Sequence, residues 1–211
     1  MGKVDINKKQ KKNALLQTAF DLFRDKGFAK TTISDIVSDA GLAKGTFYLY
    51  FKDKYDLRDK LVAHKAAQLF ADAHEALVDQ TFSSFEDQII AVADYIIGRL
   101  NADRGLLTFI SKNLSWGIFK TAFESTLPDE SKQFYDYIFE QMEKHGYVCQ
   151  EPELMLFTII ELVGSTCYNC ILYGKPVTVE EYLPYLHTVI RQIVAGFATK
   201  QPALITEKKI S

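Results

Sequence analysis

Apolar residues recur every three or four positions through most of this chain, which is the spacing that gives an α-helix one buried face. A first helix is indicated from Asn13, with apolar positions at Leu15, Leu16, Ala19, Phe20 and Phe23. Gly27 follows it, where a helix C-cap favours glycine.

A second helix is predicted from Thr32, because Asp35 stands three positions later and completes a capping box. We expect it to end at the turn signal Ala40-Gly41. The residues that it would bury are Ile33, Ile36 and Val37.

Residues 43–54 read AKGTFYLYFKDK, and a helix here has two unlike faces. At 100° per residue one face collects Ala43, Phe47 and Phe51, and we expect it to pack on the first two helices. The other side and its flanks carry Lys44, Gly45, Thr46, Tyr48, Leu49 and Tyr50. A surface helix without a partner rarely exposes such aromatic and apolar residues together, so we interpret this side as an interaction surface. The three helices have the order and the short turn of a helix-turn-helix with one supporting helix.

The rest of the sequence predicts only helices, so we expect an all-α fold. One helix is predicted from Lys54 to about Asp79, and two more start at Ser84 and at Asp103. Another starts at Pro128 and ends near Gly146. The last two are Pro152–Tyr173 and Val179–Thr199. The run Leu154–Leu172 is apolar enough to suggest a membrane span. Polar residues inside it, such as Glu161, and the Lys175-Pro176 that follows favour a buried helix and no membrane partner.

Charge is divided unevenly along the 211 residues. Residues 1–60 carry 13 basic and 8 acidic side chains, whereas the remaining 151 residues carry 12 basic and 19 acidic ones. A basic segment on an otherwise acidic chain is typical of a protein that binds a polyanion. Much of the excess comes from Lys8, Lys9, Lys11 and Lys12, which also fit a solvated tail.

The sequence offers little catalytic chemistry. Cys167 and Cys170 share a helix face and suggest a redox or metal site, but a zinc site needs four ligands and no second pair of ligands is apparent. The histidines are scattered, and there is no phosphate loop or nucleophile elbow. We therefore expect no enzyme activity, no metal and no cofactor. The start of the chain lacks an apolar run, which favours a cytoplasmic location.

These motifs resemble the TetR family of transcriptional repressors, closely over residues 10–60. The matching segments are Ala19–Phe23, Gly27-Phe28, Thr31–Ile36, Ala40–Leu42, Lys44–Phe51 and Lys54–Leu57. The sequence departs from the commoner pattern at Val37, Ala43 and Tyr55. Ala43 stands where a serine is frequent, so an N-cap and a phosphate contact are lost there.

The resemblance implies a DNA-binding role for Thr32, Lys44, Gly45, Thr46, Tyr48, Leu49, Tyr50 and Lys54. Lys44, Gly45 and Thr46 would meet base edges in the major groove. Leu49 would touch a thymine methyl group, and the other four residues would bind phosphates.

The resemblance also implies a homodimer formed through the last two long helices, which would read palindromic double-stranded operator DNA. Apolar residues available for that interface are Leu156, Ile159, Ile160, Val163, Leu186, Val189, Ile190, Ile193 and Val194.

In the family, the middle helices enclose a small-molecule inducer. Candidate ligand-binding residues are Tyr95, Phe109, Trp116, Phe119, Phe123, Glu161 and Tyr168. Aromatic residues are no denser in this part than in residues 1–60, so core packing is the plainer interpretation of each aromatic. Glu161 belongs to a polar stripe with Thr158, Ser165 and Tyr168. A carboxylate buried there would need a partner, either a ligand or a residue across the dimer, unless the stripe lies at a solvated edge.

The sequence thus predicts a helix-turn-helix DNA-binding domain in residues 1–53, a helical ligand-binding and dimerisation domain in residues 54–200, and a tail in residues 201–211. The expected function is a repressor released from its operator by an inducer. Two alternatives remain, a redox-responsive regulator that uses Cys167 and Cys170, and an activator of the same fold.

Overall fold

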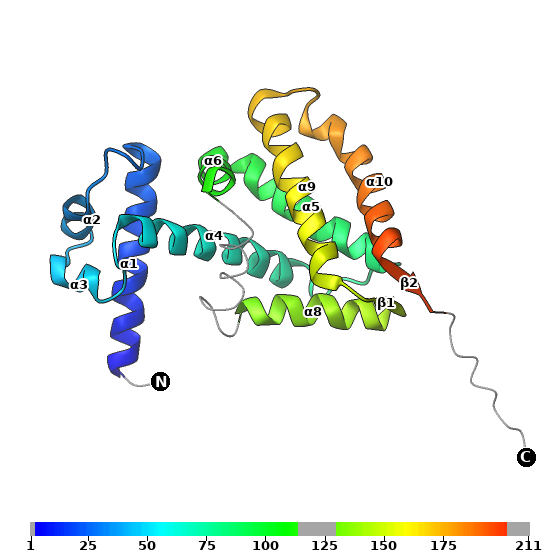
Figure 1. Cartoon of the computed structure of the whole chain (residues 1–211), viewed down its shortest axis with the longest axis horizontal. Helices are drawn as coiled ribbons and strands as arrows, with labels where there is room; N and C mark the ends of the chain where they lie inside the picture. Colours follow the sequence, from blue (N-terminus) through cyan, green and yellow to red (C-terminus); the bar gives the residue numbers. More distant parts are fainter. Residues whose placement is uncertain (1–2, 114–129, 202–211) are drawn as a thin grey trace, which may run out of the picture. The chain divides into compact units, whose positions relative to one another are not determined.

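The computed structural model describes residues 3–113 and 130–201, and the side chains of residues 5–111 and 137–201. These residues form helices and one pair of short strands (Figure 1), so the predicted all-α fold is confirmed. They divide into two compact units, one with residues up to Ala67 and the segment from Thr108, the other with Gln68–Leu107 and the residues from 130 on.

The N-terminal unit contains α1 (Lys3–Asp25), α2 (Ile33–Asp39), α3 (Lys44–Tyr48) and the start of α4 (Lys54–Leu77). Their apolar faces share one core, whose fully buried members are Leu15, Ile36, Phe47, Phe51, Leu57 and Leu61. Val37 is buried as predicted, but Ile33 is half-exposed. Gly27 and Gly41 have φ angles of 81° and 65°, which glycine adopts at little cost, and they end the first two helices.

Helix α1 begins well before the predicted start at Asn13. The side chains of residues 5–11 are exposed, and continuous burial begins only at Leu15. Apolar periodicity marks the part of a helix that packs, so it misses turns that carry mainly lysine and other polar residues. Lys8, Lys9, Lys11 and Lys12 thus lie on a helix.

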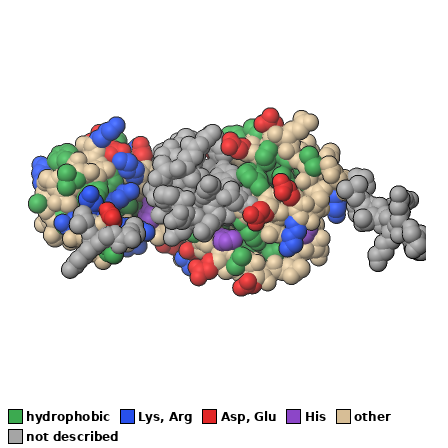
Figure 2. Space-filling view, turned by 90° about the horizontal axis from the view of Figure 1, so that it is seen from below, with side chains coloured by type: hydrophobic (Ala, Val, Ile, Leu, Met, Phe, Trp, Pro, Cys, Tyr) green, Lys and Arg blue, Asp and Glu red, His purple; other side chains and the backbone are tan. Residues whose placement is uncertain are grey.

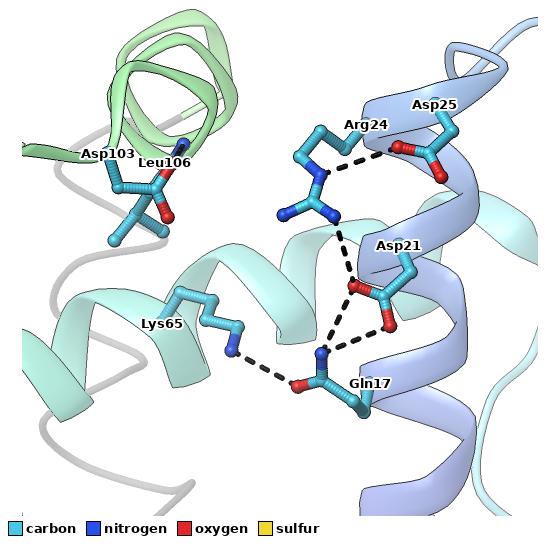
Figure 3. Close-up of polar contacts among 7 residues, drawn as sticks. All are labelled: Gln17, Asp21, Arg24, Asp25, Lys65, Asp103 and Leu106. Atoms are coloured by element: carbon cyan, nitrogen blue, oxygen red, sulfur yellow. Dashed lines mark hydrogen bonds and ion pairs between the residues drawn. The ribbon is translucent and has the colours of Figure 1, made fainter.

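Polar contacts join α1 to the adjacent turn of α4 (Figure 3). Lys65 Nζ donates to Gln17 Oε1 at 3.4 Å, and Gln17 Nε2 donates to both Asp21 carboxylate oxygens at 3.2 Å. Arg24 lies 3.9 Å from Asp21 and 3.4 Å from Asp25. Exposed ion pairs contribute little free energy, so the apolar core carries most of the stability of this unit.

The second unit contains α5 (Phe85–Ala102), α8 (Glu130–Lys144), α9 (Pro152–Tyr173) and α10 (Val179–Phe197), and α6 (Arg104–Asn113) begins in it. Ser84 caps α5 as predicted, since its hydroxyl accepts the amide hydrogen of Asp87 at 3.1 Å. Gly174 ends α9 with a φ of 60°. Thr178 and Glu181 form a capping box at the start of α10.

Two three-residue strands were not predicted. Strand β1 (Tyr147–Cys149) pairs antiparallel with β2 (Ala198–Lys200), with Val148 opposite Thr199. Strand β2 follows α10 directly, so α10 ends before the predicted Thr199. Strands this short are too brief to show a two-residue period, which explains why the sequence pattern missed them.

Helices α9 and α10 pack on each other within one subunit. Five of the residues assigned to the dimer interface are buried inside this chain: Leu156, Ile159, Leu186, Ile190 and Val194. Their interface assignment is therefore wrong, because a side chain covered by its own subunit cannot meet a partner. Ile160, Val163, Val189 and Ile193 are half-buried and keep part of their surface available. Helix α9 is also long and apolar enough to cross a membrane by length and composition alone, with a mean hydropathy of 1.5.

Candidate nucleic-acid interface

The start of α2 is closed by a reciprocal capping box. Thr32 Oγ1 accepts the Asp35 amide hydrogen at 3.1 Å, and the Thr32 amide donates to Asp35 Oδ2 at 2.9 Å. Hydrogen bonding by Thr32 lowers the pKa of the Asp35 carboxyl, which stays ionised beside the helix N-terminus. Thr32 is exposed, so its hydroxyl can still donate to a phosphate. The Asp35 carboxylate, however, already interacts with the positive N-terminal end of α2.

Helix α3 has one buried and one exposed side. Phe47 and Phe51 are completely buried, as predicted, and their rings lie 5.4 Å apart. Ala43 is exposed, which contradicts its predicted place in the core. The reason is that Ala43 is the N-cap, with an extended backbone and no side-chain cap, so the helical rotation does not apply to it. The helix ends at Tyr48, earlier than the sequence pattern suggested.

The predicted reading face is open to solvent. Lys44 and Gly45 are exposed and Thr46 is half-buried. Leu49 is 78% exposed and Tyr48 54% exposed, which are high values for large apolar side chains. The side chains of this face can therefore contact a partner.

Gly45 is not required by the fold. Its φ is not in the left-handed region, and a Cβ atom built on it would meet nothing within 4 Å. Glycine inside a helix costs about 0.5–1 kcal/mol relative to alanine. The folded domain thus gives no reason for glycine at this position, whereas a partner whose surface approaches the backbone would give one.

The segment after α3 is held by the first turns of α4. Asp53 Oδ1 accepts the amide hydrogens of Tyr55 and Asp56 at 2.8 and 2.9 Å, which caps α4. Lys60 Nζ bonds the Tyr50 carbonyl at 3.2 Å and Asp56 Oδ2 at 3.0 Å. Burial raises the pKa of the Asp56 carboxyl, but hydrogen bonds from the Lys52 amide and from Lys60 together lower it by more. The pKa of Asp56 therefore lies below its usual value. Half-buried Tyr50 is therefore fixed in place beside the exposed face.

Lys54, predicted to bind a phosphate, makes contacts within the domain. Its Nζ donates to the main-chain carbonyls of Phe28 and Thr31, both at 2.8 Å, and lies 4.4 Å from the centre of the Phe28 ring. An ammonium group has three hydrogens, so at most one remains for a phosphate. In this structure Lys54 ties the start of α4 to the loop that leads into α2.

Positive charge is concentrated on the N-terminal unit, and Figure 2 shows Lys and Arg side chains gathered there while Asp and Glu prevail on the other unit. Burial, and then the charges of Lys65, Lys12 and Lys9, lower the pKa of His64 from 6.5 to about 4. Burial and the charge of Lys60 likewise lower the pKa of Lys12. Lysines from α1 and α4 thus create a shared positive potential, which favours a polyanionic partner.

The candidate ligand-binding residues do not form a group among the described residues. Trp116, Phe119 and Phe123 lie outside the described ranges. The Phe109 ring packs against Phe20 of α1 at 5.4 Å, while Tyr95 and Tyr168 are half-buried on α5 and α9. Glu161 is exposed, so its carboxylate needs no buried partner, because the polar stripe lies on the outer side of α9.

Sequence reasoning missed a set of buried polar groups in the second unit. Gln88 on α5 is 1% exposed, and its Nε2 donates to Tyr137 Oη of α8 at 2.5 Å. The His74 ring of α4 lies 4.4 Å from the Tyr137 ring. A signal was present, since Gln88 stands on the apolar period Phe85, Ile89 and Val92 where a hydrophobic residue is expected.

The cysteine pair is a poor candidate for redox chemistry. Cys167 and Cys170 are 3% and 4% exposed within α9. Burial raises the pKa of the Cys167 thiol from 9.0 to about 11, so little reactive thiolate is present near neutral pH. Among the residues that the structure describes, no cluster of three or more His, Cys, Asp or Glu could hold a metal ion.

Comparison with known proteins gives a family match for the region that holds this interface. Residues 15–61 match the family described as bacterial regulatory proteins, TetR family. The match runs from the buried part of α1 into α4, and it includes all of α2 and α3.

Relatives of known sequence are also regulators. The chain is 51% identical over 45 residues to the uncharacterized HTH-type transcriptional regulator YerO of Bacillus subtilis, which covers 21% of this chain and 16% of that protein. It is 38% identical to the B. subtilis regulator YvdT, with 32% of this chain and 42% of YvdT covered. The chain therefore spans less than half the length of these relatives.

Solved structures share the fold over nearly the whole chain. A TetR-family transcriptional regulator from Haemophilus influenzae has a TM-score of 0.58 at 21% identity, covering 92% of this chain and 99% of that one. The regulator FadR of B. subtilis, solved in complex with stearoyl-CoA, has a TM-score of 0.61 at 17% identity, covering 84% and 96%.

Proposed function

We propose, from the premise that this chain belongs to the TetR family of bacterial regulatory proteins, that it represses transcription by binding operator DNA until a small molecule releases it. The domain assignment that goes with this proposal is DNA binding by residues 1–53, ligand binding and dimerisation by residues 54–200, and a tail in residues 201–211. The observation that carries it is the exposed face of α3.

That face has the composition of a surface that meets DNA. Lys44 can donate to both acceptors of a guanine, Thr46 offers a hydroxyl and a methyl group, and Leu49 can touch a thymine methyl. Gly45, unconstrained by the fold, lets the backbone come close to the bases. These contacts would specify the sequence.

Phosphate contacts would then position the domain. Tyr48 and Tyr50 flank the reading face, and the exposed Thr32 hydroxyl marks the start of α2. We assign Lys54 a smaller share, because two carbonyl groups already hold its ammonium. The lysines of α1 would add sequence-independent affinity through counterion release.

Dimerisation is proposed through the outer sides of α9 and α10. Exposed large apolar residues support it: Leu154 is 48% exposed, Tyr173 62% and Tyr185 71%. Such residues on a solvent face often mark an interface. A two-fold dimer would present two copies of α3 to the half-sites of a palindrome.

Release by a small molecule is proposed because the second unit is larger than DNA binding requires and because a relative of this fold was solved with a bound acyl-CoA. The redox alternative is disfavoured by the burial of Cys167 and Cys170.

The test of this function uses Gly45→Ala, with Gly98→Ala as matched control. Both glycines are exposed on helices with nothing within 4 Å of an added Cβ, so neither change should destabilise the fold. Gly98→Ala, in the interior of α5, should raise stability by about 0.5–1 kcal/mol. Only Gly45→Ala should weaken binding to duplex DNA from the upstream region of the gene. Equal DNA binding by the two variants would show that α3 does not approach DNA.

A further inference from the structure

The second unit retains a polar side chain where its fold asks for an apolar one. Among the described residues, the buried polar or charged side chains are Thr31 and Gln88. The Thr31 hydroxyl has two carbonyl oxygens within reach, Leu22 at 3.3 Å and Gly27 at 3.0 Å. Gln88 has fewer hydrogen bonds than its side chain can form, because a carboxamide has both a donor end and an acceptor end.

Three helices bring polar groups together at Gln88. Gln88 Nε2 of α5 bonds Tyr137 Oη of α8 at 2.5 Å, and the His74 ring of α4 meets the Tyr137 ring edge-on at 68°. Gln88 Oε1 and His74 Nδ1 are shielded from solvent and have no hydrogen-bond partner among the described residues. Turning the amide over does not help, because Tyr137 can meet one end only and the other stays unpaired.

This arrangement reduces stability. A buried polar atom without a partner destabilises the folded state, whereas an apolar side chain of similar shape in that place is close to neutral. The neighbouring positions on the same helix faces, Leu77, Phe85 and Val92, are apolar and buried. A stability cost that the fold does not need is typical of a binding site.

The chemistry of the cluster limits its ligand. Gln88 and Tyr137 offer uncharged donors and acceptors, and the carboxylates that precede Gln88 on α5 bond elsewhere, Glu86 to Tyr147 at 2.7 Å and Asp87 to Arg191 at 2.6 Å. Without a permanently charged side chain in the cluster, a charged ligand group would be costly to bury here. A ligand group that both donates and accepts can bond to Gln88 Oε1, which accepts, or to His74 Nδ1, whose role depends on the tautomer.

We propose that Gln88, Tyr137 and His74 form a buried recognition site for an uncharged ligand with an apolar body and one hydroxyl or amide group. This proposal deepens the proposed function. It rests on that function only for its consequence, the release of DNA when such a ligand binds. The polar group of the ligand bonds to the cluster, and its apolar body lies along the apolar faces of α4 and α5.

The test is thermal melting of the full chain with 1-decanol, decanamide and decanoate as probes. The two uncharged probes should raise the melting temperature of the wild type, and decanoate, with the same chain but a negative charge, should not. Gln88→Leu should melt at or above the wild-type temperature without probe and bind 1-decanol at least tenfold more weakly. Gln68→Leu makes the same change at an exposed position of α4 and should respond like the wild type.

Tyr137→Phe keeps the ring and removes the hydroxyl, so it should also weaken the response to 1-decanol. The proposal is overturned if Gln88→Leu is stabilised by 1-decanol as much as the wild type, if neither uncharged probe stabilises the wild type, or if Gln88→Leu without probe melts below the wild type. These melts involve no DNA. Operator binding measured on the same preparations therefore separates failure of this site from failure of the proposed function.

Discussion

Lys54 and Thr31 are joined by a 2.8 Å hydrogen bond from the lysine ammonium to the main-chain carbonyl. The bond connects the first residue of α4 to the residue just before the capping box of α2. A second bond, to the Phe28 carbonyl, completes the attachment. The loop that orients α2 is thus held by a residue that the family resemblance assigns to DNA.

Lys54→Met should therefore destabilise the N-terminal unit by about 1–3 kcal/mol, because two carbonyl groups lose their charged donor. Chemical denaturation of the full chain measures this. Lys52→Met, two residues earlier and exposed, is the control and should change stability little. If Lys54→Met unfolds like the wild type and only its DNA affinity falls, Lys54 is a phosphate contact and not a structural tie.

The pKa of His64 predicts a pH dependence of stability. Its folded pKa of about 4 is below the unfolded value of 6.5, so the unfolded state binds the proton first as pH falls. The free energy of unfolding should decrease from pH 6.5 towards pH 4, by an amount on the order of 1–3 kcal/mol. His64→Gln should flatten this part of the curve, because it removes the group whose pKa differs between the two states. An identical slope in His64→Gln would contradict the assignment.

The thiols should differ in reactivity. Cys149 on β1 is half-buried, whereas Cys167 and Cys170 are buried inside α9. Iodoacetamide at pH 8 should modify Cys149 first, and mass spectrometry of the folded protein should find Cys167 unmodified until denaturant is added. Formation of a Cys167–Cys170 disulfide in the folded, air-oxidised protein would instead support the redox alternative.

Assembly is tested at Tyr185, which is 71% exposed on α10. Tyr185→Asp should shift sedimentation equilibrium from dimer to monomer while the helical content by circular dichroism stays unchanged, because a charge buried between subunits is unpaired. Leu49→Asp, at a similarly exposed residue of the N-terminal unit, is the control and should remain dimeric. Ile190→Asp is unsuitable, since Ile190 is fully buried within its own subunit. A dimeric Tyr185→Asp would place the interface elsewhere.

Helix positions were predictable because two local signals agree. The apolar period shows which side packs, and the cap residues Thr32, Ser84 and Gly174 lie where the structure places helix ends. Both signals depend on residues within a few positions of one another. They fail where a helix extends beyond its packed part, as in α1, and where a segment is too short to show a period, as in β1.

Burial against a partner was not predictable. The apolar period of α10 includes both Ile190, covered by its own subunit, and Val189, half-exposed, and the sequence cannot tell which surface covers a residue. The Gln88 cluster was missed for a related reason. Its members lie on three helices far apart in the sequence, so only the tertiary fold brings them together.

The reading face of α3 is the central claim, and selection of binding sites from a randomised DNA duplex library measures it most directly. The wild type should enrich two half-sites related by a two-fold axis. Lys44→Ala should relax preference at one symmetric base pair in each half-site, at about 1–3 kcal/mol per site, with the rest of the motif kept. A wild type that enriches no common sequence, or a Lys44→Ala variant that binds every duplex more weakly by the same factor, would contradict the account.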